Sequence, residues 1–242
     1  MSIASRLSAP SRTWLPRVAA VAGAGALAVT LMVGGALAGG APPVRTPEPA
    51  FNPAAPAGKL QTAVLAGGCF WGLQGVYEHV RGVTRVVAGY AGGSEATAHY
   101  EIVGTETTGH AETVKITFDP AVISYGEILR IYFSVATDPT QLNEQFPDQG
   151  SSYRGDIFYM DAGQKAVAAR YIAQLKAAHV YRKPIVTRLD PYPGFFPAEA
   201  YHQDYLVKHP DAGYIATYDM PKVAALKTLL PADYRPKPVT LG

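Results

Sequence analysis

The chain has 242 residues, of which 48% are hydrophobic and 17% charged, and its formal net charge is +2. This balance is typical of a soluble globular protein. Such a small net charge, with no basic stripe interleaved with aromatic residues, gives no reason to expect a nucleic-acid partner. Cys69 is the single cysteine, so the sequence excludes an internal disulfide and a cysteine-based metal cluster.

Residues 1–38 have the features of a targeting segment. The first 17 residues hold three arginines and no acidic residue, and an apolar stretch begins at Val18. Ala36-Leu37-Ala38 then offers a small-residue cleavage site, which favours a cleaved signal peptide. An uncleaved membrane anchor is the main alternative, because the stretch is just long enough to span a bilayer. An organelle transit peptide is a third interpretation. Either main interpretation places the folded part in the periplasm or outside the cell, and an anchor would attach it to the membrane.

Three regions follow the targeting segment. Residues 39–58 are rich in proline and alanine, which predicts an extended linker outside the core. Residues 59–230 have the size of one domain. We expect residues 231–242 to be a tail, and the chain from Pro210 onward to be mostly coil.

Within the domain, hydrophobic periodicity predicts strands alternating with helices. The strands are expected near 63–66, 83–90, 113–118, 153–159 and 185–189, and the helices near 70–78, 127–135, 161–178 and 198–207. Long polar loops at 94–108 and 137–151 are candidates for function. Hairpin-joined strands mixed with crossover helices indicate an α+β fold, a two-layer ferredoxin-like α/β plait with a mixed sheet.

The stretch around Cys69 organises this pattern. Gly67-Gly68 lets the chain turn sharply between a buried strand and the helix that starts at Phe70. At a helix N-terminus, the helix dipole and free N–H groups would stabilise a thiolate. Cys69 is therefore a candidate nucleophile, with a small buried apolar residue as the alternative.

Several polar residues are candidate partners of this thiol. A cysteine hydrolase or acyltransferase would need a histidine base, and spacing alone singles out none of the six histidines; His110 and His202 are the candidates we retain. Glu112 begins a half-buried strand, where burial would raise its pKa and let it donate a proton at neutral pH. A solvent-facing glutamate at a strand end is the alternative.

The sequence resembles the peptide methionine sulfoxide reductase family of the A type. The resemblance covers about residues 59–229 and is carried by motifs in family order. They are Gly68-Cys69-Phe70-Trp71-Gly72, Ala88-Gly89-Tyr90-Ala91-Gly92-Gly93, Thr108-Gly109-His110-Ala111-Glu112, Asp138-Pro139-Thr140-Gln141, Asp148-Gln149-Gly150-Ser151-Ser152-Tyr153-Arg154, and Phe196-Pro197-Ala198-Glu199-Ala200-Tyr201-His202-Gln203.

The resemblance implies reduction of the S-epimer of methionine sulfoxide, free or in oxidised proteins. It makes Cys69 the nucleophile that becomes a sulfenic acid and Glu112 the acid near the sulfoxide oxygen. Tyr100, Asp148 and Tyr153 complete the polar side of the pocket. Phe70 and Trp71 form its apolar side, and Gly68 and His110 complete the substrate site. No bound cofactor or metal is implied, and a non-catalytic binder of methionine or its sulfoxide is a further alternative.

The chain departs from the family pattern in three places. Many members carry resolving cysteines near the C-terminus, whereas here Gly213-Tyr214 is followed by Ile215. A thioredoxin-like protein or a small thiol must then reduce the oxidised Cys69 directly. Thr137 stands where relatives often have histidine, and Gly104-Thr105-Glu106 differs from the family's usual loop. We expect the protein to act as a monomer.

The targeting segment yields a direct prediction. If it is a cleaved signal, the exported protein begins near Gly39, which N-terminal mass spectrometry of material made with the full sequence would detect. An intact N-terminus on exported protein would instead support the anchor.

Overall fold

The computed structural model describes residues 42–54 and 58–242, and all of these belong to one compact unit. The predicted targeting segment lies outside the described residues, as do 39–41 and 55–57 of the predicted linker. Within the described ranges, no helix combines the length and the apolar character needed to cross a bilayer.

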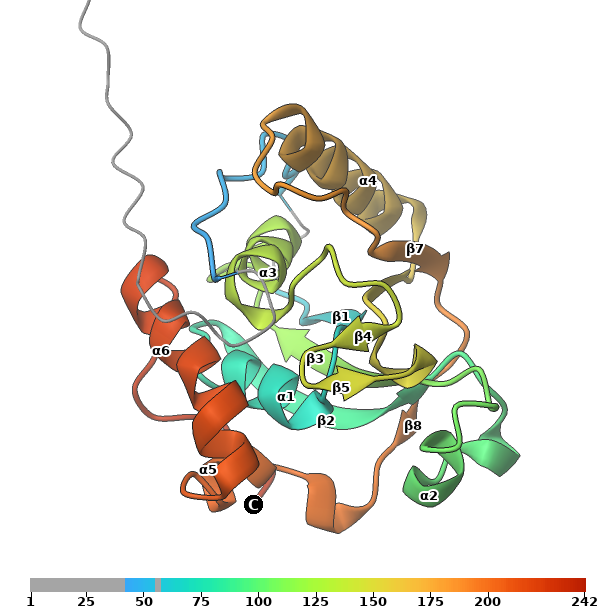
Figure 1. The fold of residues 1–242 in the computed structure, drawn as a ribbon. Helices are drawn as coiled ribbons and strands as arrows, with labels where there is room; N and C mark the ends of the chain where they lie inside the picture. The colour runs from blue at the N-terminus through green and yellow to red at the C-terminus, as the bar shows by residue number, and fades with distance from the viewer. Residues whose placement is uncertain (1–41, 55–57) are drawn as a thin grey trace, which may run out of the picture. The chain divides into compact units, whose positions relative to one another are not determined.

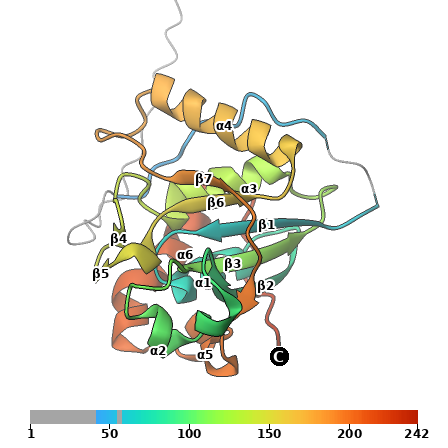
Figure 2. The same cartoon turned by 90° about the vertical axis from the view of Figure 1, so that its right-hand side faces the viewer.

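A six-stranded mixed sheet forms the centre of the unit (Figures 1 and 2). Its strand order is β7–β6–β1–β3–β2–β8, and every neighbouring pair is antiparallel except β6–β7. The strands are β1 (Gln61–Ala66), β2 (Val83–Ala91), β3 (Ala111–Phe118), β6 (Asp156–Tyr159), β7 (Arg188–Pro191) and β8 (Phe196–Pro197). A smaller hairpin joins β4 (Glu144–Gln145) to β5 (Asp148–Gln149). The prediction of an α+β fold with a mixed sheet is confirmed.

The longer helices share one side of this sheet. Ala63 and Leu65 of β1 belong to the main core, together with residues of α1, α3, α4 and α6, whereas the alternate residues Val64 and Ala66 face a small cluster around Phe158. This is the period-two alternation of a strand between two faces. The helices are α1 (Phe70–Glu78), α2 (Tyr100–Val103), α3 (Tyr125–Ile131), α4 (Ala162–Ala177), α5 (Tyr205–Lys208) and α6 (Met220–Leu229).

Side-chain caps fix where two of these helices start. The Ser124 hydroxyl accepts the Glu127 N–H at 3.1 Å and begins α3, which continues into a π-helical turn, Tyr132–Ala136. The Asp161 carboxylate accepts the Gln164 N–H at 2.8 Å and begins α4.

The prediction that residues 39–58 lie outside the core is wrong for the part that the structure describes. Residues 42–54 have no regular secondary structure, but Thr46 is buried. Its hydroxyl lies 2.7 Å from the Ser134 hydroxyl and 2.8 Å from that of Tyr171. A proline-rich composition predicts extended backbone, but it does not determine whether that backbone packs against the domain.

The prediction of coil after Pro210 is also wrong. A π-helical turn, Ile215–Asp219, leads into α6, and Val223, Leu226 and Leu229 of α6 are buried. The predicted helix 198–207 is instead a 3₁₀ turn, Ala200–His202, followed by the single turn of α5, because Asp204 between them has φ 57°. The last residues pack back on the domain, with the Val239 N–H bonded to the Glu78 carbonyl at 2.9 Å.

Candidate active site

The turn before Cys69 requires its two glycines. Gly68 has φ 94°, and a Cβ there would lie 2.7 Å from the Gln145 side chain. A Cβ on Gly67 would lie 2.9 Å from the Thr137 hydroxyl. Only bare backbone fits between β1 and the loop around Gln145, which places Cys69 at the N-cap of α1.

The Glu112 side chain extends from β3 to the N-terminal end of α1. The side chain is 3% exposed, so the alternative of a solvent-facing glutamate is excluded. One carboxyl oxygen accepts the Phe70 N–H at 2.9 Å, an orphan donor of the first turn of α1. Burial raises the pKa of Glu112 to about 8, the Phe70 N–H opposes the shift, and the negative charges of Asp148, Asp219 and Glu106 add to it. Glu112 is therefore predominantly protonated at neutral pH.

Cys69 differs from the expectation of a stabilised thiolate. Its side chain is 8% exposed, and burial raises its pKa well above the ordinary value. At the alkaline pH where the thiol would ionise, the Glu112 and Asp219 carboxylates act in the same direction, and a hydrogen bond from the Trp71 N–H opposes them. The helix N-terminus is present as predicted, but desolvation outweighs its effect. The resting residue is a neutral thiol.

The predicted polar residues surround this pair. Burial raises the pKa of Tyr100 to about 12, and electrostatic interactions with Glu112 and Cys69 contribute to this increase. Burial and the charges of Glu112 and Asp148 likewise raise the pKa of Tyr153. The Cys69 thiol, the two phenols and the Glu112 and Asp148 carboxyl groups therefore influence one another electrostatically, and their joint role in catalysis stays a prediction.

Phe70 and Trp71, the predicted apolar side of the site, follow Cys69 directly in α1. Phe70 is 1% exposed and packs against Tyr90 and His202, with ring centroids 5.7 and 5.0 Å away. Most of its side-chain surface therefore contacts other core residues. Trp71 is half-buried and stacks on Tyr205, with centroids 4.0 Å apart.

Both candidate histidine bases are engaged elsewhere. The Gly93 N–H donates to His110 Nδ1 at 3.2 Å, so Nε2 carries the proton and donates to the Ser94 carbonyl at 2.9 Å. His202 Nδ1 accepts the indole N–H of Trp71 at 3.0 Å, which leaves the protonated Nε2 facing a Glu199 oxygen 3.9 Å away. His110 thus holds the turn after β2 in place, and its assignment to the substrate site stays a prediction.

Sequence reasoning missed two residues of the site. The Tyr214 hydroxyl donates to an Asp148 carboxylate oxygen, and its ring meets Trp71 edge-on at 6.0 Å. Asp219 is fully buried with its charge partner Lys222 at 3.1 Å, and a Cβ on Gly72 would lie 2.1 Å from its carboxylate. Both lie in the region predicted as coil, so no predicted element placed them near Cys69.

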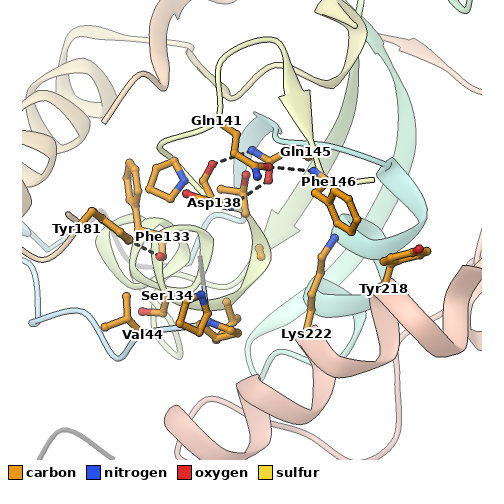
Figure 3. A pocket seen from close by; sticks show the side chains of 16 residues that line it. Val44, Phe133, Ser134, Asp138, Gln141, Gln145, Phe146, Tyr181, Tyr218 and Lys222 are labelled. Atoms are coloured by element: carbon orange, nitrogen blue, oxygen red, sulfur yellow. Dashed lines mark hydrogen bonds between the residues drawn. The ribbon is translucent and has the colours of Figure 1, made fainter. Parts of the chain in front are cut away.

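A groove is lined by the loop 137–146 together with residues such as Tyr181, Tyr218 and Lys222 (Figure 3). Gln145 of this lining packs against Gly68 and exchanges two hydrogen bonds with the backbone of Asp138, at 3.0 and 2.7 Å. Phe146 and Tyr218 of the lining meet edge-on, with centroids 5.9 Å apart. These bonds hold the loop that supports the Cys69 turn.

The arrangement favours one kind of chemistry. A neutral carboxyl group lies at the same helix end as the single thiol, and the phenols of Tyr100 and Tyr153 interact electrostatically with both, so proton donors are available beside the sulfur. Among the described residues, no group of three or more histidine, cysteine, aspartate or glutamate side chains is placed to hold a metal ion. Such a site suits a thiol-dependent oxidoreductase that removes oxygen from its substrate.

Comparison with known proteins agrees with this class. Residues 61–232 match the model of the family described as "Peptide methionine sulfoxide reductase". The "Peptide methionine sulfoxide reductase MsrA 2" of Mesorhizobium japonicum is 54% identical over 74% of this chain and 92% of its own length. An MsrA of Thermus thermophilus is 44% identical over 73% of this chain and 98% of its own. The chain belongs to the peptide methionine sulfoxide reductase family and is an oxidoreductase.

Two solved structures share the fold. The reduced form of Mxr1 from Saccharomyces cerevisiae has a TM-score of 0.59 and 29% identity, covering 66% of this chain and 91% of its own. Methionine sulfoxide reductase A of Corynebacterium diphtheriae has a TM-score of 0.53 and 29% identity, covering 62% of this chain and 76% of its own.

The raised pKa of Glu112 predicts how stability depends on pH. Between about pH 4.5 and 8 the folded state retains a proton that the unfolded state has lost, so the contribution of Glu112 to stability falls as the pH rises. A Glu112→Gln variant, which cannot ionise, should gain stability relative to wild type by about 1.4 kcal/mol per pH unit across this window. Urea unfolding of both proteins over this pH range measures the difference, and a difference that stays constant would contradict the assignment.

Proposed function

We propose that the protein reduces methionine-S-sulfoxide, free or within oxidised proteins, to methionine through a sulfenic acid on Cys69. The observation that carries this proposal is the neutral Glu112 beside Cys69 at the start of α1. A sulfoxide sulfur becomes electrophilic only when its oxygen accepts positive character, and a protonated carboxyl group supplies this where an ionised one would oppose it.

The proton balance of the reaction follows from two neutral groups. Glu112 donates its proton to the sulfoxide oxygen as Cys69 Sγ attacks the sulfoxide sulfur, and the resulting carboxylate accepts the proton that the thiol releases. The hydroxyl group then transfers from the substrate sulfur to Sγ as the S–O bond and the newly formed sulfur–sulfur bond break, so methionine leaves and Cys69 becomes a sulfenic acid. Sulfur in the substrate is reduced by two electrons and Cys69 is oxidised by two. Glu112 ends the step protonated again.

The other side chains of the site bind and orient the substrate. Tyr100 and Tyr153 donate hydrogen bonds to the oxygen that strengthen as the S–O bond polarises, and Asp148 orients the polar side of the pocket. Phe70 and Trp71 give the S-methyl group an apolar contact surface and exclude water. Polar donors on one side and an aromatic pair on the other would accept one sulfoxide epimer, which supports S-selectivity.

Regeneration of Cys69 needs a thiol from outside the chain. The 242 residues contain no second cysteine, so the sulfenic acid cannot form an internal disulfide. A thioredoxin-like protein or a small thiol attacks Cys69, releasing water and forming a mixed disulfide, and a second thiol then frees Cys69.

Further features belong to the same proposal. The central order β6–β1–β3–β2, with antiparallel pairing throughout, supports the ferredoxin-like plait. The arginine-containing, apolar start of the chain supports export to the periplasm or cell exterior, with cleavage near Gly39 or retention as an anchor. We expect the exported enzyme to be a monomer that repairs oxidised proteins.

The alternative functions have less support. A cysteine hydrolase or acyltransferase needs a base for Cys69, and the ring nitrogens of His110 and His202 that could accept a proton already accept N–H bonds. A non-catalytic methionine binder would have no use for a buried neutral acid beside a thiol.

An assay with both sulfoxide epimers tests the proposal. With dithiothreitol, wild type should reduce methionine-S-sulfoxide and leave the R-epimer unchanged. Cys69→Ser should abolish turnover, and Glu112→Gln should lower kcat by about 10²- to 10⁴-fold, the usual range for loss of a general acid. Without dithiothreitol, dimedone should trap the sulfenic acid on Cys69, detected by mass spectrometry.

Glu95→Gln is the matched control, because Glu95 is an exposed carboxylate outside the pocket, and it should keep wild-type kinetics. Reductase activity that survives Cys69→Ser would overturn the proposal. A stable acyl-enzyme would favour the hydrolase, and binding without turnover in wild type would favour the binder.

A further inference from the structure

Tyr100, Asp148 and Tyr153 lie on two connecting segments, whereas Glu112 lies on β3 of the central sheet. Tyr100 begins α2, which follows β2, whereas Asp148 begins β5 and Tyr153 ends the 3₁₀ turn that comes after it. Both segments are largely polar and partly exposed, so apolar burial does little to hold them. Specific hydrogen bonds must therefore hold the two loops in position relative to Cys69.

Glu106 provides three of these bonds with one side chain. Its carboxylate accepts the Ser152 N–H at 2.8 Å, the Ser152 hydroxyl at 2.6 Å and the Ser151 hydroxyl at 3.0 Å. The Glu106 N–H is itself bonded to the Val103 carbonyl, at the end of α2, at 3.0 Å. Glu106 thus connects the segment that carries Tyr100 to the segment that carries Tyr153.

The backbone at Glu106 is strained in the conformation that makes this connection. Glu106 has φ 63°, a left-handed conformation that is unfavourable for a residue other than glycine. Gly150, with φ 135°, presents bare backbone to the carboxylate: a Cβ there would lie 2.3 Å from the Glu106 carboxyl carbon. A strained residue and an adjoining glycine both serve the same contact, which indicates that the contact has a function.

We propose that Glu106 is a positioning residue, which locks the Asp148–Tyr153 loop onto the α2 loop and so holds Tyr153 and Asp148 against Cys69. This inference rests on the proposed function, because it assigns Glu106 to the groups that bind the sulfoxide oxygen. The Glu106 carboxylate does not contact the substrate; it acts through Ser151 and Ser152, which directly precede Tyr153 in the chain.

The charge of Glu106 has a second, measurable effect. With Asp148 and Asp219, it is one of the negative charges that raise the pKa of Glu112, against the Phe70 N–H that lowers it. Removing the Glu106 charge therefore lowers the pKa of Glu112. The pH above which Glu112 loses its proton then shifts downward.

Two variants separate these effects. Glu106→Gly relieves the strained backbone but removes the carboxylate, and kcat/KM should fall by about 10- to 100-fold, mainly in kcat, as expected when reacting groups are misplaced. Glu106→Gln keeps the shape and loses the charge, so it should show a smaller loss and an alkaline limit of kcat at lower pH. The controls are Glu95→Gln and His179→Gly, the latter at an exposed position with the same left-handed backbone, and both should behave as wild type.

Amide hydrogen exchange over residues 148–154 gives a readout that does not depend on activity. Exchange there should accelerate in Glu106→Gly and stay at the wild-type rate in His179→Gly. Unchanged exchange, or wild-type kinetics and pH profile in both Glu106 variants, would overturn the inference. A wild-type protein that reduces neither sulfoxide epimer would refute the proposed function, and the exchange rates would still decide whether Glu106 locks the loop.

Discussion

The site depends on the hydrogen bond between the Phe70 N–H and the Glu112 carboxyl group. It joins the start of β3 to the start of α1 and places the Glu112 carboxyl group next to Cys69. The bond is also a balance between opposing effects. A helix N-terminus favours an anion, while burial of a carboxyl group favours the neutral form. Glu112 accepts a single backbone N–H, so burial prevails and the group stays protonated to about pH 8.

The same balance determines the state of Cys69. The thiol lies at the end of the same helix, and burial and neighbouring carboxylates hold it neutral. Cys69 and Glu112 are both neutral in the resting site. Each therefore holds one of the two protons that move in the reaction, and the two groups do not repel each other as anions would. A polar substrate that removes one proton from Glu112 creates the base that accepts the other.

Much of this could be predicted from the sequence where local pattern is decisive. The glycine pair, the apolar spacing of 70–78 and the alternation of 113–118 predicted β1, α1 and β3, and with them the relation of Cys69 to a helix start. The resemblance to the family predicted Glu112, Tyr100, Asp148 and Tyr153. The direction of the Cys69 pKa shift could not be predicted, because desolvation depends on packing by distant segments. The roles of His110 and Glu106 were also hidden, since each depends on which backbone groups a loop brings within reach.

Infrared difference spectroscopy of the unliganded protein measures the protonation state of Glu112. The spectrum of Glu112→Gln, subtracted from that of wild type, removes the contribution of other buried acids such as Glu78. We expect the C=O stretch of a protonated carboxyl group at neutral pH, lost with a midpoint near pH 8. A carboxylate band at neutral pH that titrates near the ordinary value of 4.5 would contradict it.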